Sequence, residues 1–320
     1  MIEVMEVEGT PPRSQEPQIL AIGKFDGVHI GHQEILRVAR SLADTEHISV
    51  MSFWPHPAWA LSKKPGYDRA LTPKREQARL LESLGVDRQY RVEFTKEYAS
   101  TSAEQFVEEH LSVLNLRGIV VGVDFTFGKG GAAKAQDLAW YTERIAVPVH
   151  VVSPVEENGL KVSSSQVRAH LENGRVEAAE ALLGRPYSIV GKVAHGQELG
   201  RKLGFPTANL EGIDEYVMPA AGVYAVSVQV HKEESPATAI VDGASQTWFG
   251  VMNAGYRPTV DGTRFQVEVH LLDFSGDLYG QMLRVSFLGR VRDEQKFPSL
   301  GALTAQIQVD AAAVRRLFGL

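Results

Sequence analysis

The hydrophobic pattern of this 320-residue chain changes its period near Gly184-Arg185-Pro186, and this change limits the possible folds more than any other feature. Before it, short apolar runs alternate with segments in which apolar residues recur at helical spacing. After it, apolar residues take every second position, as in Val223–Val230 and Phe265–Leu271. Since a chain of this length usually forms about two domains, we predict one domain at residues 1–184 and another at residues 185–320.

Residues 1–184 predict an α/β fold, because strands that alternate with helices form βαβ units and a mostly parallel sheet. The expected strands are Gln18–Gly23, Ile48–Phe53, Gly118–Val123 and Val147–Val152. The expected helices are Gly31–Ala43, Pro73–Leu84, Ser102–Leu114, Lys134–Arg144, Ser165–Glu172 and Val176–Leu183. Residues 185–320 predict an antiparallel barrel or sandwich, since glycine and proline separate short alternating strands. One or two amphipathic helices are expected in Ser299–Phe318.

The composition excludes several classes of protein. The chain has no cysteine, and therefore no disulfide, thiolate zinc site or cysteine nucleophile. Its net charge of −6 argues against a dedicated nucleic-acid binder, because such proteins carry a basic excess. Its longest uncharged run, Tyr216–Val230, contains Pro219 and Gly222 and is too short to span a bilayer. The acidic N-terminus does not resemble a secretory signal. We expect a cytoplasmic protein without a nucleic-acid or membrane partner, and the oligomeric state stays open.

The run from Gly23 to His32, GKFDGVHIGH, follows the first expected strand and precedes a helix. It places His29 and His32 at the carboxyl edge of a parallel sheet, where open α/β folds bind ligands. A helix N-terminus attracts phosphate, and histidines there can donate to phosphate oxygens as charge develops in a transition state. The alternatives are a glycine turn with two surface histidines, or half of a metal site without an obvious third ligand. The length of the run favours a functional role.

Two features of the second half could carry chemistry. The stretch Gly196–Asn209 contains three glycines as well as Arg201 and Lys202, and Thr207 and Asn209 offer oxygen ligands suited to Mg²⁺ and phosphate. An ordinary loop is an equally good interpretation of its composition. Glu268 lies on the polar face of an alternating strand, where it could act as a general base or metal partner. The pattern alone favours a solvated strand face.

These motifs resemble those of a known family, the bacterial bifunctional riboflavin kinase/FMN adenylyltransferases, also called prokaryotic FAD synthetases. The resemblance extends from about Gln18 to the C-terminus, and its motifs occur in the same order. The first half contributes Gly23–His32, Phe53–Pro57, Gly122–Gly128 and Ser163–Arg168; the second contributes Gly204–Asn209, Gly250–Thr259, the segment around Glu268, and Asp273-Phe274 with Leu278-Tyr279-Gly280. Ser165 and Thr126 depart from the usual Thr and Arg, and Lys232–Phe249 is expected to form an extended hairpin.

The resemblance implies two ATP-dependent activities. An α/β nucleotidylyltransferase domain would join FMN to ATP, giving FAD and pyrophosphate, and a six-stranded barrel would phosphorylate riboflavin. It implies that His29, His32 and Glu268 are catalytic and that Thr207 and Asn209 hold Mg²⁺. It implies nucleotide contacts at Gly23, Phe25, Asp26, Gly27, Ser164, Ser165, Arg168, Gly204, Thr207 and Asn209, and flavin contacts at Asp124 and Phe127. The alternatives are a chain in which only one module works, with the kinase favoured as that module, and a non-catalytic flavin-sensing regulator.

Overall fold

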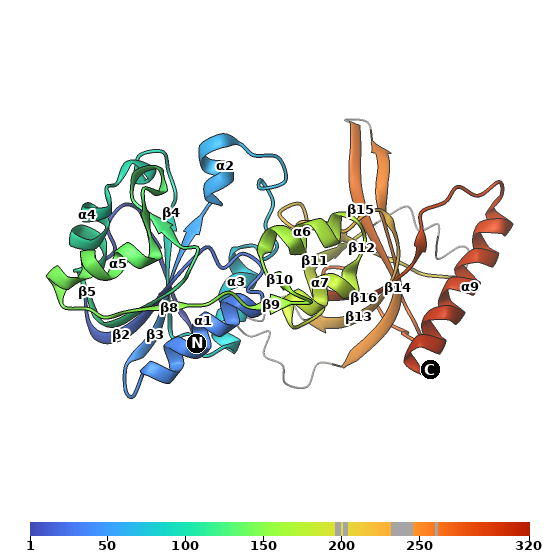
Figure 1. Cartoon of the computed structure of the whole chain (residues 1–320). Helices are drawn as coiled ribbons and strands as arrows, with labels where there is room; N and C mark the ends of the chain where they lie inside the picture. Colours follow the sequence, from blue (N-terminus) through green and yellow to red (C-terminus); the bar gives the residue numbers. More distant parts are fainter. Residues whose placement is uncertain (196–199, 201–203, 232–245, 260–261) are drawn as a thin grey trace. The chain divides into compact units, whose positions relative to one another are not determined.

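The computed structural model describes residues 1–195, 200, 204–231, 246–259 and 262–320. Arg201, Lys202 and residues 232–245, which include most of the expected extended hairpin, lie outside the described residues. The contacts within the chain divide it into two compact units, Met1–Ser164 and Ser165–Leu320. Figure 1 shows a parallel sheet with helices in the first unit and a barrel in the second.

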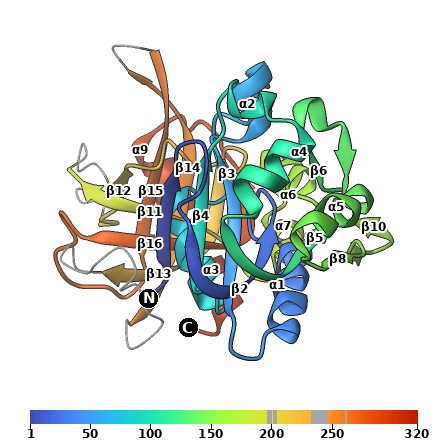
Figure 2. The same cartoon turned by 90° about the vertical axis from the view of Figure 1, so that its left-hand side faces the viewer.

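The first unit contains a six-stranded parallel sheet, which confirms the predicted α/β fold. Its strands lie in the order β1-β4-β3-β2-β5-β8, and neighbours β4, β3 and β2 can be followed in Figure 2. They are β1 (Glu3–Val7), β4 (Arg88–Glu93), β3 (His47–Trp54), β2 (Ser14–Ile22), β5 (Leu114–Gly122) and β8 (Val149–Val152). The sequence pattern did not predict β1 and β4, which form one edge of the sheet.

Helices cover both faces of this sheet. On one face, Ile19 and Ala21 of β2 pack against α1 (Ile30–Leu42) and α3 (Lys74–Ser83). On the other face, Leu20 and Ile22 pack with α5 (Ala135–Thr142) and the π-helix η2 (Phe106–Leu111). The smaller elements are α2 (Pro57–Ser62), η1 (Tyr98–Ser100), α4 (Ala103–Gln105), β6 (Thr126–Phe127), η3 (Lys129–Gly131), β7 (Ala133–Lys134), η4 (Glu143–Ile145), β9 (Glu156–Glu157) and β10 (Leu160–Lys161).

The helix expected over Ser102–Leu114 is shorter and less regular than predicted. It begins as expected, because Ser102 and Gln105 form a reciprocal capping box. From Phe106 the helix widens into π-helical turns that end at Leu111, and Leu114 already belongs to β5. The π-helix buries the imidazole of His110, whose Nδ1 has no hydrogen-bond partner within the described residues.

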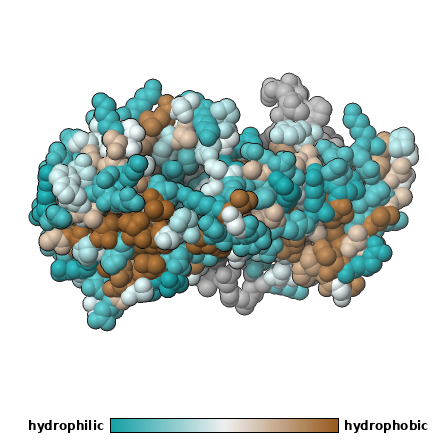
Figure 3. Space-filling model, viewed as in Figure 1, coloured by the Kyte–Doolittle hydropathy of each residue, from teal (hydrophilic) through white to brown (hydrophobic). Residues whose placement is uncertain are grey.

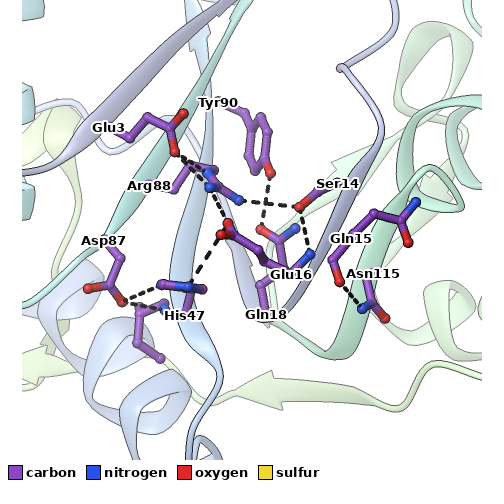
Figure 4. Close-up of polar contacts among 11 residues, drawn as sticks. Glu3, Ser14, Gln15, Glu16, Gln18, His47, Asp87, Arg88, Tyr90 and Asn115 are labelled. Carbon is purple, nitrogen blue, oxygen red and sulfur yellow. Dashed lines mark hydrogen bonds and ion pairs between the residues drawn. The ribbon is translucent and has the colours of Figure 1, made fainter.

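A network of polar side chains joins the amino ends of the strands (Figure 4). The Arg88 guanidinium, at the start of β4, donates to Glu3 Oε2 at 2.7 Å, to Ser14 Oγ at 3.3 Å and to Glu16. The hydrogen bond from Arg88 lowers the pKa of the Glu16 carboxyl. Asp87 accepts from the Ile48 backbone at 2.8 Å. The network therefore lies at the amino edge of the sheet, opposite to the edge where the Gly23–His32 loop follows β2.

The second unit is a closed, antiparallel, six-stranded barrel in the order β11-β12-β15-β14-β13-β16, which confirms the predicted barrel. Its strands are β11 (Tyr187–Ala194), β12 (Ala208–Glu211), β13 (Gly222–His231), β14 (Thr247–Thr259), β15 (Gly262–Leu271) and β16 (Met282–Asp293). The C-terminal segment forms one helix, α9 (Leu300–Phe318), which packs against β14 and β16 (Figure 1).

Over the face drawn in Figure 3, hydrophilic residues predominate and hydrophobic residues gather in smaller areas.

Helices α6 (Ser164–Glu172) and α7 (Val176–Leu183) group with the barrel in their contacts. Helix α7 packs on β11 and β16, and its Glu177 Oε1 accepts the Arg290 backbone N–H at 3.1 Å. Leu171 accepts the Ala220 backbone N–H at 2.9 Å. The boundary predicted at 184/185 would instead separate these helices from the barrel.

We predict that a fragment of residues 185–320 is less stable than a fragment of residues 164–320. The shorter fragment exposes the barrel surface that α7 covers with its buried apolar side chains. Because each such side chain contributes about 1.5–3 kcal/mol when buried, the midpoint of thermal unfolding should fall by about 10 °C or more. Circular dichroism melts of the two fragments measure this. Equal midpoints would support the boundary at 184/185.

A second prediction concerns the pH dependence of stability. Burial lowers the pKa of His110, against smaller opposing effects of Glu109 and Gly9. The unfolded chain therefore binds more protons than the folded chain as the pH falls through about 6.5, and stability is lost in that range. His110→Gln keeps hydrogen-bonding capacity without titrating. Its melting temperature should fall less between about pH 7.5 and 5.5 than that of the unaltered protein. Identical losses in the two proteins would contradict the assignment.

Candidate active sites

The structure brings the two histidines of the Gly23–His32 run together at the start of α1. His29 is the N-cap of this helix, and its Nδ1 accepts from the His32 backbone N–H at 3.4 Å. The two imidazole rings stack, with centroids 3.7 Å apart and planes inclined by 20°. Because His29 Nδ1 accepts, the proton of the neutral ring lies on Nε2. The predicted pair of imidazoles at a helix N-terminus is therefore present in the fold.

The turn before the histidines adopts an unusual backbone. Phe25 and Val28 have positive φ angles of 51° and 42°, a region that side chains other than glycine seldom adopt. The Phe25 ring folds back beside Gly23, where a Cβ would lie 3.2 Å from it. Phe25 is fully buried and Asp26 is 7% exposed. These two side chains thus face the protein interior, and contacts to a ligand would come from their backbone.

Asp26 is held by backbone groups of a distant segment. Its Oδ1 accepts from the N–H of Leu71 at 2.8 Å and of Thr72 at 3.3 Å. Thr72 Oγ1 in turn accepts from the Gly27 N–H at 3.0 Å. Ser164 Oγ donates to the Asp26 carbonyl oxygen at 2.7 Å, so the serine motif and the glycine loop meet at this residue. The structure therefore gives the Asp26 carboxylate a role in holding the turn.

The remaining predicted residues of this half lie in different environments. Asp124 Oδ2 accepts from Lys161 Nζ at 2.8 Å. Partial burial opposes ionisation of Asp124, but Lys161, together with Lys24, keeps the pKa of this carboxyl below its ordinary value. Phe127 is only 6% exposed. It packs against Phe106, Phe125 and Tyr141 in the core. In α6, Ser165 is exposed and Arg168 is buried.

Sequence reasoning overlooked Lys161. This lysine stands in β10, two residues before the serine motif, and a lone exposed lysine carries no recognisable pattern. Its pairing with Asp124 joins residues 37 positions apart in the chain. Only the fold places them together.

In the barrel, strand register aligns three polar residues on neighbouring strands. Asn209 of β12 lies opposite Glu268 of β15, and Glu268 lies opposite Asn253 of β14. Residues directly opposite in a sheet share a face. The preceding and following positions, such as Val267 and Val269, are buried inside the barrel, so the three polar residues belong to its outer face. Asn253 was recognised only as part of a longer motif, and the register shows its place beside Glu268.

Thr207 directly precedes β12, and its position is supported from β15. His270 Nδ1 lies 2.9 Å from the Pro206 carbonyl oxygen, to which it donates. The ring of His270 also meets Phe205 edge-on, with centroids 5.4 Å apart. Gly204 is exposed and has a φ angle of 85°. The structure thus gathers Gly204, Thr207, Asn209 and Glu268 at the β12–β15 side of the barrel.

The chain thus combines a paired-imidazole loop on a parallel sheet with an oxygen-rich strand face on a small barrel. Family models match both modules: residues 11–166 match the family described as FAD synthetase, and residues 183–318 match the family described as riboflavin kinase. The chain belongs to the bifunctional riboflavin kinase/FMN adenylyltransferases. Its barrel module phosphorylates riboflavin to FMN, and its parallel-sheet module joins FMN to ATP to form FAD.

Relatives with this description match almost the whole chain. The Escherichia coli (strain K12) protein is 38% identical over 98% of both chains. The Bacillus subtilis (strain 168) protein is 36% identical over 95% of this chain and 93% of its own, and the Pseudomonas fluorescens protein is 40% identical over 93% and 92%.

A solved structure has the same fold over both modules. It is a crystal structure described as a macrolide-efflux protein from Streptococcus pneumoniae. That protein is 33% identical, covers 98% of this chain and 99% of its own, and has a TM-score of 0.87. In the part of our chain that the structure describes, no helix is both long and apolar enough to cross a membrane.

Proposed function

We propose that the loop from Gly23 to His32 is the site of adenylyl transfer. An oxygen of the FMN phosphate attacks the α-phosphorus of ATP, the bond from that phosphorus to the bridging oxygen breaks, and pyrophosphate leaves. This reaction needs no covalent enzyme intermediate, so the protein contributes positioning and charge stabilisation. The observation that carries the proposal is the stacked pair His29 and His32 at the N-terminus of α1.

Other groups of the first half complete this proposed site. Gly23 and Gly27 allow the backbone to approach the nucleotide closely, and the backbone of Phe25 and Asp26 contributes rather than their buried side chains. Ser164 supports the turn through Asp26, and we assign Ser165 and Arg168 to the phosphates. Asp124 contributes to the flavin side together with its partner Lys161, and Phe127 supports that side from within the core.

We propose that Glu268 is the general base of the riboflavin kinase. Its carboxylate accepts the proton of the terminal ribityl hydroxyl as that oxygen attacks the γ-phosphorus of ATP, and ADP leaves. The position of Glu268 on a central stretch of β15, between β12 and β14, supports this role, because a strand holds a carboxylate in a fixed direction. Gly204 gives the nucleotide close access to the loop before β12.

The barrel site offers the type of ligands that Mg²⁺ prefers. The Thr207 hydroxyl and the Asn209 amide oxygen are hard oxygen donors, and the register places Asn209 directly beside Glu268. The described residues contain no group of three or more histidine and acidic side chains arranged as metal ligands. We therefore assign the ion to Thr207 and Asn209 together with the phosphates of ATP. When bound, it would neutralise charge on the phosphates.

We also propose that the enzyme acts in the cytoplasm. The absence of cysteine from the whole sequence gives the fold no dependence on an oxidising compartment. Both reactions consume ATP, which supports the same location.

The proposed histidine roles predict a selective loss. Replacing His29 or His32 by Ala should slow FAD formation from FMN by roughly 10²–10³-fold, the usual effect of removing one such donor. Riboflavin phosphorylation by the same chains should not change. His47→Ala is the matched control, because His47 lies at the amino end of β3, where it is close to Glu16 and Asp87 of the polar network. Normal FAD synthesis by the double variant would refute the assignment.

Glu268→Gln should have the opposite selectivity. It preserves shape but removes the base, which contributes about 10²–10⁴-fold in such reactions. FMN formation from riboflavin should fall by this amount, whereas FAD formation from supplied FMN should persist; chromatographic separation of FMN and FAD over time measures both. Glu211→Gln, the same chemical change at an exposed position of β12, is the control. If both activities of Glu268→Gln decline together, the residue supports the fold instead.

A further inference from the structure

A buried chain of polar side chains extends from the sheet to the glycine loop. Gln77 lies on α3, and Gln89 and Arg91 lie on β4. All three are at most 5% exposed, although amides and guanidinium groups are seldom buried without hydrogen bonds. None of them belongs to a sequence motif of the two sites.

Gln77 contacts the loop directly. Its Nε2 donates to the carbonyl oxygens of Lys24 and Phe25, both at 3.2 Å. Its Oε1 accepts from Gln89 Nε2 at 2.7 Å. Gln89 Nε2 also donates to Ser52 Oγ at 2.9 Å. The side-chain amide of Gln77 is therefore engaged on both sides, by the loop and by the sheet.

The donors and acceptors among these side chains allow only one orientation of the Gln77 and Gln89 amides. Backbone carbonyls can only accept, so the NH₂ group of Gln77 must face Lys24 and Phe25. Its oxygen must then face the NH₂ group of Gln89. The remaining oxygen of Gln89 accepts from Arg91 Nη2 at 3.2 Å, and a guanidinium can only donate. Arg91 Nη2 also donates to the Lys74 carbonyl at 2.8 Å, and Arg91 pairs with Glu6.

Fixing these two carbonyls also fixes the peptide groups that contain them. In a planar trans peptide the C=O and N–H bonds point in opposite directions. The N–H of Phe25 and the N–H of Asp26 therefore point away from Gln77. Consecutive backbone N–H groups in a turn with positive φ form a concavity that binds anions.

We propose that Gln77 is a positioning residue for adenylyl transfer. It holds the Lys24–Asp26 peptides so that their N–H groups are directed at the phosphates of ATP. The two backbone carbonyls by themselves set the orientation of the Gln77 amide, and Gln89 and Arg91 do not touch the loop. The inference rests on the proposed function of the Gly23–His32 loop as the nucleotide site.

The test is the Gln77→Met variant of the full-length protein, which preserves chain length and burial but removes both donors. For FAD formation, kcat/KM for ATP should fall by roughly 10–100-fold, as expected when reacting groups are displaced by a fraction of an ångström or more. The KM for FMN should change by less than about twofold, because the flavin does not contact this turn in the proposed site. Riboflavin phosphorylation by the barrel module should not change.

Gln89→Met is the matched control for a purely structural effect. It makes the same chemical change one step further from the loop, in the same buried layer, and leaves the two donors of Gln77 in place. Its melting temperature should fall about as much as that of Gln77→Met, while its kcat/KM for ATP should fall by less than about threefold. Equal kinetic losses in the two variants would overturn the inference.

Gln77→Glu provides a second variant in case the methionine does not fold. It presents an acceptor to two carbonyl acceptors, so the loss for ATP should be at least as large. A kcat/KM for ATP within twofold of the unaltered protein in either folded variant would also overturn the inference. Parallel assays of His29→Ala separate the two hypotheses: if His29→Ala is fully active the proposed site is wrong, and if only the Gln77 variants are active Gln77 alone is wrongly assigned.

Discussion

The turn between β2 and α1 depends on hydrogen bonds that come from elsewhere in the first unit. Positive φ angles at Phe25 and Val28 cost about 1–2 kcal/mol each, and Val28 is β-branched. Asp26 compensates by accepting two backbone N–H groups, and Thr72 accepts the Gly27 N–H. The turn connects the end of the buried strand β2 to α1, and it thereby places the paired imidazoles at the start of that helix. The positions of His29 and His32 therefore depend on the residues that precede them.

The two modules position their polar side chains by different structural means. In the first, a strained turn at the end of one strand carries the histidines, and contacts from distant segments hold it. In the barrel, regular strand pairing is sufficient, because Asn209, Glu268 and Asn253 follow from the register alone. The first arrangement needs many supporting side chains, whereas the second needs only the correct hydrophobic alternation of three strands.

Hydrophobic periodicity predicted both fold classes because most strands obey it. It did not predict β4, since Gln89 and Arg91 occupy inward positions of that strand and are buried. Local patterns also located His29 and His32, which are close in sequence. They could not show that the Phe25 and Asp26 side chains face inward, or that Lys161 pairs with Asp124, because those contacts join segments far apart in the chain. The π-helical turns at Phe106–Leu111 were likewise not predicted, because the sequence pattern of Ser102–Leu114 indicates only a helix.

The alternation along β15 links the outer face of the barrel that carries Glu268 to the barrel core. Val267 and Val269 fill the interior, and Glu268 between them faces outward. A slip of one residue in the pairing of this strand would move the carboxylate inside and a valine outside. Single-residue insertions or deletions within β15 would therefore disturb the packing of the barrel core together with the position of Glu268. Replacing one side chain by another within the strand keeps this register, whereas a change in chain length keeps it only outside the strand.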